Sequence, residues 1–163
     1  MQSFVHLHVH SQYSLLDGQA SINQIVDKAM NDGMPGIALT DHGAMYGIKE
    51  FVNYIDSAKS NIRNEIEQLS KELADNPDNQ KLKNEIEAKT TKLNFKPIIG
   101  CECYCARRGR FQQTEKIDGS GWHLVVLAKN LTGYKNLIKM VSKSWTEGFY
   151  YRPRIDHDIL KQY

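Results

Sequence analysis

The sequence contains little cysteine, little proline and no long apolar run. Of its 163 residues only three are cysteine and four are proline. Cys101, Cys103 and Cys105 are odd in number and alternate along one short stretch, which argues against the disulfide framework of a small secreted protein. The N-terminus lacks a basic segment followed by a long apolar stretch, and no run approaches the length that spans a bilayer. The sequence therefore predicts a cytoplasmic protein with reduced thiols and no membrane partner.

A strong charge of either sign is also missing. Lysine and arginine number 21 and aspartate and glutamate 19, so the formal net charge is +2. This balance is too small to indicate nucleic-acid binding through bulk electrostatics. The length and a hydrophobic content of 40% are ordinary for one globular domain, and a core can form.

Histidine is concentrated near the start. Three of the six histidines lie in residues 4–11, FVHLHVHS, where they alternate with apolar residues. Side chains alternate between the two faces of a strand, so a strand here would place His6, His8 and His10 on one face. Neutral imidazoles can all donate lone pairs to one cation, whereas protonated ones repel each other. A half-buried strand with histidine on its polar face is the alternative, and we favour a metal site.

The next segments predict a strand–helix–strand unit. Ser21 resembles a helix N-cap before an apolar stripe that ends near Gly33, and residues 36–40 resemble a strand covered on both sides. Asp41 and His42 follow that strand directly. In parallel α/β folds the C-terminal ends of strands collect the chemistry. Asp41 alone could cap a helix, but beside His42 it favours a metal site.

Residues 56–96 differ in composition from their surroundings, because glutamate, lysine and asparagine dominate. Their apolar residues recur at alternating four- and three-residue steps on both sides of the turn at 76–79. We interpret this segment as an inserted antiparallel helical hairpin, which would project roughly 30 Å. A solvated surface insertion explains it most simply, and a partner-binding arm is the alternative.

Two further strands are expected at 96–105 and 122–128. In the first, Glu102 faces opposite to the three cysteines, and a buried carboxylate requires a cation, a metal or an arginine. Zinc ligation by the cysteines is the alternative, although the paired CxxC spacing is absent. His123 lies near the start of the second strand. The basic loop at 107–121 is expected to be solvated, with a flexible phosphate-binding loop as the alternative.

Five phrases in order resemble the polymerase and histidinol phosphatase (PHP) family: LHVHS at 7–11, LLDG at 15–18, LTDHG at 39–43, PIIGCE at 97–102 and HLVVLAKN at 123–130. The segment at 130–156 is similar to PHP domains of bacterial replicative DNA polymerases, the polymerase III alpha subunits. The resemblance implies an α/β fold, a distorted (βα)7 barrel that is partial and truncated here. Residues 1–163 would form the N-terminal part of the PHP domain, with the hairpin at 56–96 inserted in it.

The same resemblance implies a site for up to three divalent metal ions, zinc, manganese or iron. The implied ligands are His8, His10, Asp17, His42, Glu102 and His123. His6 and Asp41 are implied as supporting residues behind them. Other ligands of the family belong to later motifs, expected after Tyr163.

The implied chemistry is phosphodiester hydrolysis, in the form of a 3′–5′ proofreading exonuclease on the primer 3′ end. The parent chain is expected to be a DNA-directed DNA polymerase with a magnesium-dependent synthesis site, bound to DNA and to other replicase subunits. One alternative is a module that stabilises the polymerase core or a partner without hydrolysis, which we expect of this segment alone. Another is a phosphatase for small phosphomonoesters, which the segment at 130–156 disfavours.

Overall fold

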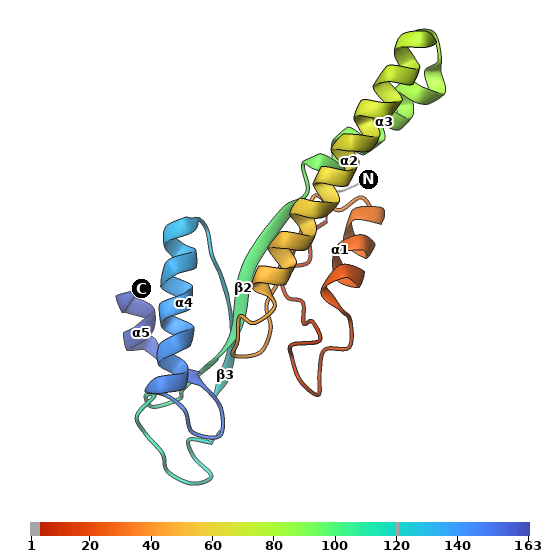
Figure 1. Cartoon of the computed structure of the whole chain (residues 1–163). Helices are drawn as coiled ribbons and strands as arrows, with labels where there is room; N and C mark the ends of the chain where they lie inside the picture. The colour runs from red at the N-terminus through yellow and green to blue at the C-terminus, as the bar shows by residue number, and fades with distance from the viewer. Residues whose placement is uncertain (1–3, 120) are drawn as a thin grey trace.

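A computed structural model describes residues 4–119 and 121–163. They form a mixed α/β fold in which one long strand, β2, runs between two groups of helices (Figure 1). The elements in chain order are α1 (Ile22–Asn31), β1 (Gly36–Leu39), α2 (Ile48–Asp75), α3 (Gln80–Leu93), β2 (Lys96–Cys105), β3 (Trp122–Leu127), α4 (Leu131–Thr146), β4 (Arg154–Ile155) and α5 (His157–Gln162).

The described residues contain a four-stranded sheet centred on β2. The first part of β2 pairs in parallel with β1, and its last two residues pair in parallel with β4. Residues 100–105 pair with β3, which is antiparallel. A regular alternation of parallel strands and helices would require a helical crossover between β2 and β3. Residues 106–119 and 121, the described part of this connection, contain no helix, and an antiparallel neighbour needs none.

The expected strand at 4–11 is wrong as a regular strand. The segment does lie along β1, because Ala38 donates its N–H to the carbonyl of His6 and Thr40 donates to the carbonyl of Val9, both at 2.9 Å. In a regular parallel ladder, N–H donors two residues apart on one strand bond to carbonyl acceptors two residues apart on the other strand. Here the acceptors are three apart and the chain bends at Leu7. The extra residue shifts the alternation of side chains between His6 and Val9.

Two apolar clusters flank the sheet. One packs α1 and the base of α2 against β1, around Phe51 and Phe95. The other packs α4 and α5 against the three cysteines of β2. Cys101, Cys103 and Cys105 are buried free thiols, as their alternation predicted. β2 therefore separates an apolar face from the face that carries Glu102.

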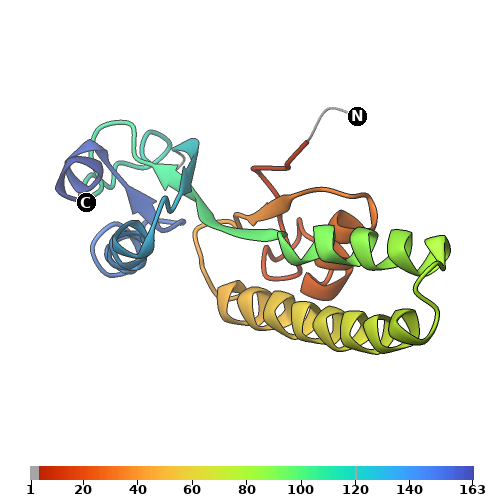
Figure 2. The same ribbon diagram turned by 90° about the horizontal axis from the view of Figure 1, so that it is seen from above.

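The predicted helical hairpin forms, and it projects from the rest of the chain (Figure 2). Its first arm is the distal part of α2, which runs unbroken for 28 residues, about 42 Å at 1.5 Å per residue. Ile48, Phe51 and Ile55 bury the base of α2 in the core, whereas α3 buries none of its residues. Residues 56–96 as an inserted unit remain a prediction. No helix in the described ranges is long and apolar enough to cross a membrane.

The loop at 107–121 is largely exposed, as the sequence predicted, but ion pairs also anchor it to the rest of the fold. The side chain of Arg110 is 12% exposed, and its guanidinium donates to Asp156 at 3.0 Å and to Glu147 at 2.9 Å. Arg108 pairs with the buried carboxylate of Asp118. These ion pairs join positions up to 46 residues apart, which local sequence patterns do not reveal.

Candidate metal centre

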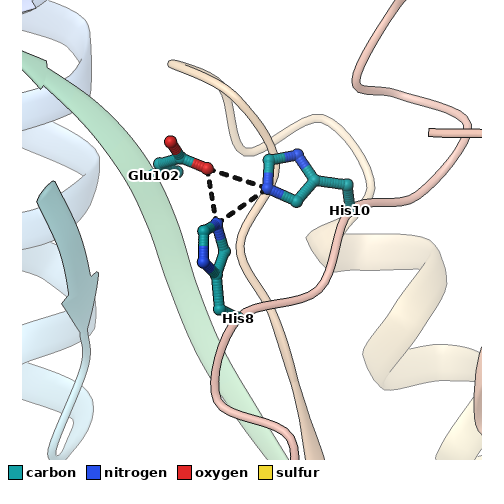
Figure 3. Close-up of side chains that lie close together, drawn as sticks. All are labelled: His8, His10 and Glu102. Atoms are coloured by element: carbon teal, nitrogen blue, oxygen red, sulfur yellow. Dashed lines mark hydrogen bonds and ion pairs between the residues drawn. The ribbon is translucent and has the colours of Figure 1, made fainter. Parts of the chain in front are cut away.

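Four separate parts of the chain meet beside the polar face of β2. His8 and His10 come from the irregular first segment, Asp17 from the turn that follows, and His42 from the end of β1. Glu102 lies in β2, and His123 lies in β3 directly opposite Tyr104. Figure 3 shows His8 and His10 pointing toward the carboxylate of Glu102. The structure thus brings together all six side chains that the sequence predicted as ligands.

Glu102 occupies the centre of this group and is 2% exposed. Its Oε2 atom lies 2.5 Å from Nε2 of His8, 2.8 Å from Nε2 of His10 and 3.5 Å from Nδ1 of His42. Its Oε1 atom contacts Nδ1 of His123. Burial raises the pKa of the Glu102 carboxyl, but the hydrogen bond from His8 and the nearby imidazoles outweigh burial and lower it overall. The carboxylate is therefore ionised at neutral pH.

Asp17 and His42 form the outer side of the centre. Nε2 of His42 contacts Oδ2 of Asp17, which also lies 3.9 Å from Nδ1 of His10. The hydrogen bond from His42 lowers the pKa of Asp17. Burial, assisted by the neighbouring His42, lowers the pKa of His10. A neutral imidazole beside an ionised carboxylate offers lone pairs to a cation.

The donor atoms suit divalent metal ions. Three overlapping groups each bring three donor atoms within 4.8 Å of one another: His8, His10 and Glu102; His10, Asp17 and His42; His42, Glu102 and His123. Nδ1 of His42 is buried and, within the described part of the chain, has no hydrogen-bond partner. Unpaired buried polar atoms are rare and costly, and a bound cation would satisfy this one. Imidazole and carboxylate donors suit zinc, manganese and iron.

The two residues predicted to support the ligands lie in different places. His6 does not share a face with His8 and His10, because it lines a hollow beside α1 together with Val9. Its ring also meets that of Phe4, 4.7 Å away. The expectation of three histidines on one face is therefore wrong.

Asp41 is 2% exposed and accepts hydrogen bonds from Ser11 N–H at 2.7 Å, Ser11 Oγ at 2.8 Å and Ser14 Oγ at 2.7 Å. Ser14 Oγ also lies 3.1 Å from Nδ1 of His10. Asp41 therefore fixes the turn that positions His10.

Tyr104 belongs to the site but was missed in the sequence. Its ring stacks on His42 at 5.8 Å between centroids and meets His123 edge-on at 5.0 Å. The signal was present, because Tyr104 lies two residues after Glu102 and so shares its face of β2. The cysteines alternate to the other face, and none of their thiols belongs to the three donor groups found among the described residues. The alternative of a cysteine zinc site thus has no geometric support.

Known proteins resemble this chain along nearly its whole length. The sequence model of the PHP domain matches residues 6–163. The DNA polymerase III subunit alpha of Borreliella burgdorferi is 42% identical over 161 residues, covering 98% of this chain and 11% of the relative. Those of Treponema pallidum and Chlamydia pneumoniae are 40% and 38% identical over 162 residues, covering 99% of this chain and 11% and 10% of the relatives. The chain spans about a tenth of the length of these relatives.

Proposed function

Because this chain belongs to the PHP domain family, we propose that it is a metal-dependent phosphoesterase module of a replicative DNA polymerase. The observation that carries the proposal is the convergence of four imidazoles on the buried carboxylate of Glu102. The similarity to DNA polymerase III alpha subunits over nearly the whole chain supports the assignment to replication. In this proposal the sheet around β2 is part of a distorted (βα)7 barrel.

The six predicted ligands would hold up to three divalent ions. Bound there, they would supply Lewis-acid chemistry, polarising a phosphodiester and lowering the pKa of a water molecule. Glu102 presents one oxygen toward His8 and His10 and the other toward His123, so it would contribute to holding ions in two of the donor groups. Its burial holds both oxygens in place. Asp17, with a side chain 59% exposed, lies where a substrate can approach from solvent.

The proposed substrate is the 3′ end of a DNA primer, hydrolysed in the 3′–5′ direction to remove mismatched nucleotides. Template-directed synthesis by the longer parent chain would use a separate magnesium site. Its partners would be DNA, the polymerase core and other replicase subunits. The family match and the names of the relatives support these proposals.

Metal analysis of the purified protein tests the proposal. Glu102 belongs to two donor groups and Asp17 to one. Glu102→Gln should therefore weaken the binding of two ions, and Asp17→Asn the binding of only one. Elemental analysis after dialysis should therefore show a larger loss of metal for Glu102→Gln than for Asp17→Asn. Glu67→Gln, on the exposed part of α2, is the control and should keep the wild-type content. Equal metal content in all four proteins would refute the site.

Hydrolysis is tested separately on the full-length protein. A labelled primer with a mismatched 3′ end should be shortened by the wild type, and a chelator should abolish the reaction. The combined change of His8→Ala and His10→Ala should abolish it as well, because both imidazoles belong to the Glu102 group.

One observation favours a second candidate, a module that packs against the polymerase core without hydrolysis. Tyr46, Trp145 and Phe149 are 65%, 42% and 48% exposed, and Tyr46 and Trp145 line one groove beside α4. Exposed aromatic residues that gather in this way are typical of interaction surfaces. Primer hydrolysis that survives loss of both His8 and His10 would favour this second candidate.

A further inference from the structure

Arg152 lies beside the candidate metal centre with its charge unpaired. Its Nη1 atom donates to the hydroxyl of Tyr104 at 2.7 Å, and its guanidinium carbon lies 4.7 Å from the centre of that ring. Arg152 is exposed, and no carboxylate of the described residues lies within ion-pair distance of it. The tyrosine therefore fixes the side chain while leaving most of its donors free for a ligand.

The backbone around Arg152 is held in place. Tyr151, just before it, has a φ of +60°, which costs energy for a residue with a side chain. Pro153, just after it, packs against Gly43, where a Cβ atom would lie 2.7 Å from the proline Cγ. Gly43 in turn directly follows His42. The turn that carries Arg152 is thus packed directly against the wall of the centre.

Tyr104 separates Arg152 from the ligands by one ring. The tyrosine whose hydroxyl accepts the hydrogen bond from Arg152 also stacks its ring on His42 and meets His123 edge-on. Arg152 therefore lies next to the ligand cluster but not within it. If the ligand cluster bound one phosphate of a DNA strand, Arg152 would be free to contact the neighbouring phosphate of that strand.

A second arginine–aromatic pair lies on the opposite side of the sheet. Arg107 lies 4.9 Å above the ring of Trp122 and is also exposed. Trp122 is directly opposite Cys105, whose thiol belongs to the apolar face of β2. Directly opposed residues point to the same face, so this pair is on the side away from Glu102. Arg107 provides a matched control for Arg152.

We propose that Arg152 binds the backbone phosphate next to the one held at the metal centre, so that the site selects a polynucleotide over an ester with a single phosphate. Guanidinium binds phosphate oxygens through paired, charge-assisted hydrogen bonds, and the contact to Tyr104 positions it beforehand. This assignment rests on the proposed phosphoesterase function and adds a residue that determines its substrate class.

Steady-state kinetics with two substrates test the assignment. One is a single-stranded oligonucleotide, and the other is the p-nitrophenyl ester of thymidine 5′-monophosphate, which has only one phosphate. Arg152→Ala should raise KM for the oligonucleotide about 10-fold and leave kcat and the small ester unchanged. The affinity of Arg152→Ala for the oligonucleotide should also depend less on salt. The slope of log affinity against log salt concentration should become less negative by roughly 0.7, the value of one phosphate contact on a single strand. Arg152→Lys should recover part of the loss, because it keeps the charge but not the paired geometry.

The control Arg107→Ala should behave as the wild type with both substrates. Equal losses on both substrates for Arg152→Ala, or no loss on either, would overturn the assignment. Wild-type protein that hydrolyses neither substrate would refute the proposed phosphoesterase function instead. In that case fluorescence anisotropy with a labelled oligonucleotide decides the role of Arg152. Binding about 10-fold weaker in Arg152→Ala supports the phosphate contact, and equal binding overturns it.

Discussion

Arg154 should be among the residues most important for stability in the second half of the chain. Its side chain is 1% exposed and donates hydrogen bonds to four backbone carbonyls, those of Gly148, Gln112, Asp118 and Arg110, at 2.8 to 3.0 Å. Burial lowers the pKa of its guanidinium. The change Arg154→Met keeps an unbranched apolar side chain and removes every donor.

The expected loss follows from the carbonyls that remain. A buried acceptor without a partner costs about 1–3 kcal/mol. Three of the four carbonyls belong to the loop at 107–121, where water can reach some of them after the change, so the lower end of this range applies. The carbonyl of Gly148 keeps the backbone N–H of Arg154 at 3.3 Å, so three carbonyls lose their partner. Arg154→Met should therefore destabilise the protein by about 3 kcal/mol, a large fraction of the 5–15 kcal/mol typical of a domain.

Urea unfolding followed by circular dichroism measures this loss, and limited proteolysis should show faster cleavage within 107–121. Arg152→Met, at an exposed position two residues away, is the control and should lose no more than about 1 kcal/mol, from its single hydrogen bond to Tyr104. Arg154→Lys should lie between the wild type and the methionine variant, because one ammonium cannot reach four carbonyls. A loss below about 1 kcal/mol for Arg154→Met, with unchanged cleavage, would refute the reasoning.

Two further changes test the packing near the centre and the ion pair in the loop. Gly43→Ala should cost about 2 kcal/mol, from its φ of +58° and its contact with Pro153. Gly33→Ala, at φ +74° with open space around it, should cost less, and equal shifts in melting temperature would contradict the role of the contact. Arg108 lowers the pKa of Asp118 to about 2, so this carboxylate stabilises the fold above its unfolded pKa of about 3.9, and the contribution is lost as pH falls toward 2. The melting temperature of Asp118→Asn should therefore fall less steeply than that of the wild type between pH 4 and pH 2, and parallel curves would contradict this.

Much of the site could be predicted from the sequence because it depends on local periodicity. Alternation along β2 places Glu102 opposite to the cysteines, and the structure confirms both faces. The spacing of apolar residues predicts the hairpin, and the positions of His42 and His123 follow from the strands beside them. These features require only that a strand has a period of two and a helix a period of 3.6.

The rest required the tertiary structure. The sequence by itself determined that His42, Glu102 and His123 lie at the ends or on the polar faces of strands, and the motifs indicated the family. It did not determine that an extra residue in the first segment turns His6 away, because this depends on pairing with β1. Nor did it show Arg152 on Tyr104, 48 residues away, or Arg154 among four carbonyls. These contacts join distant positions, and no short-range pattern encodes which arginine becomes buried and which remains beside the candidate metal centre with its charge free.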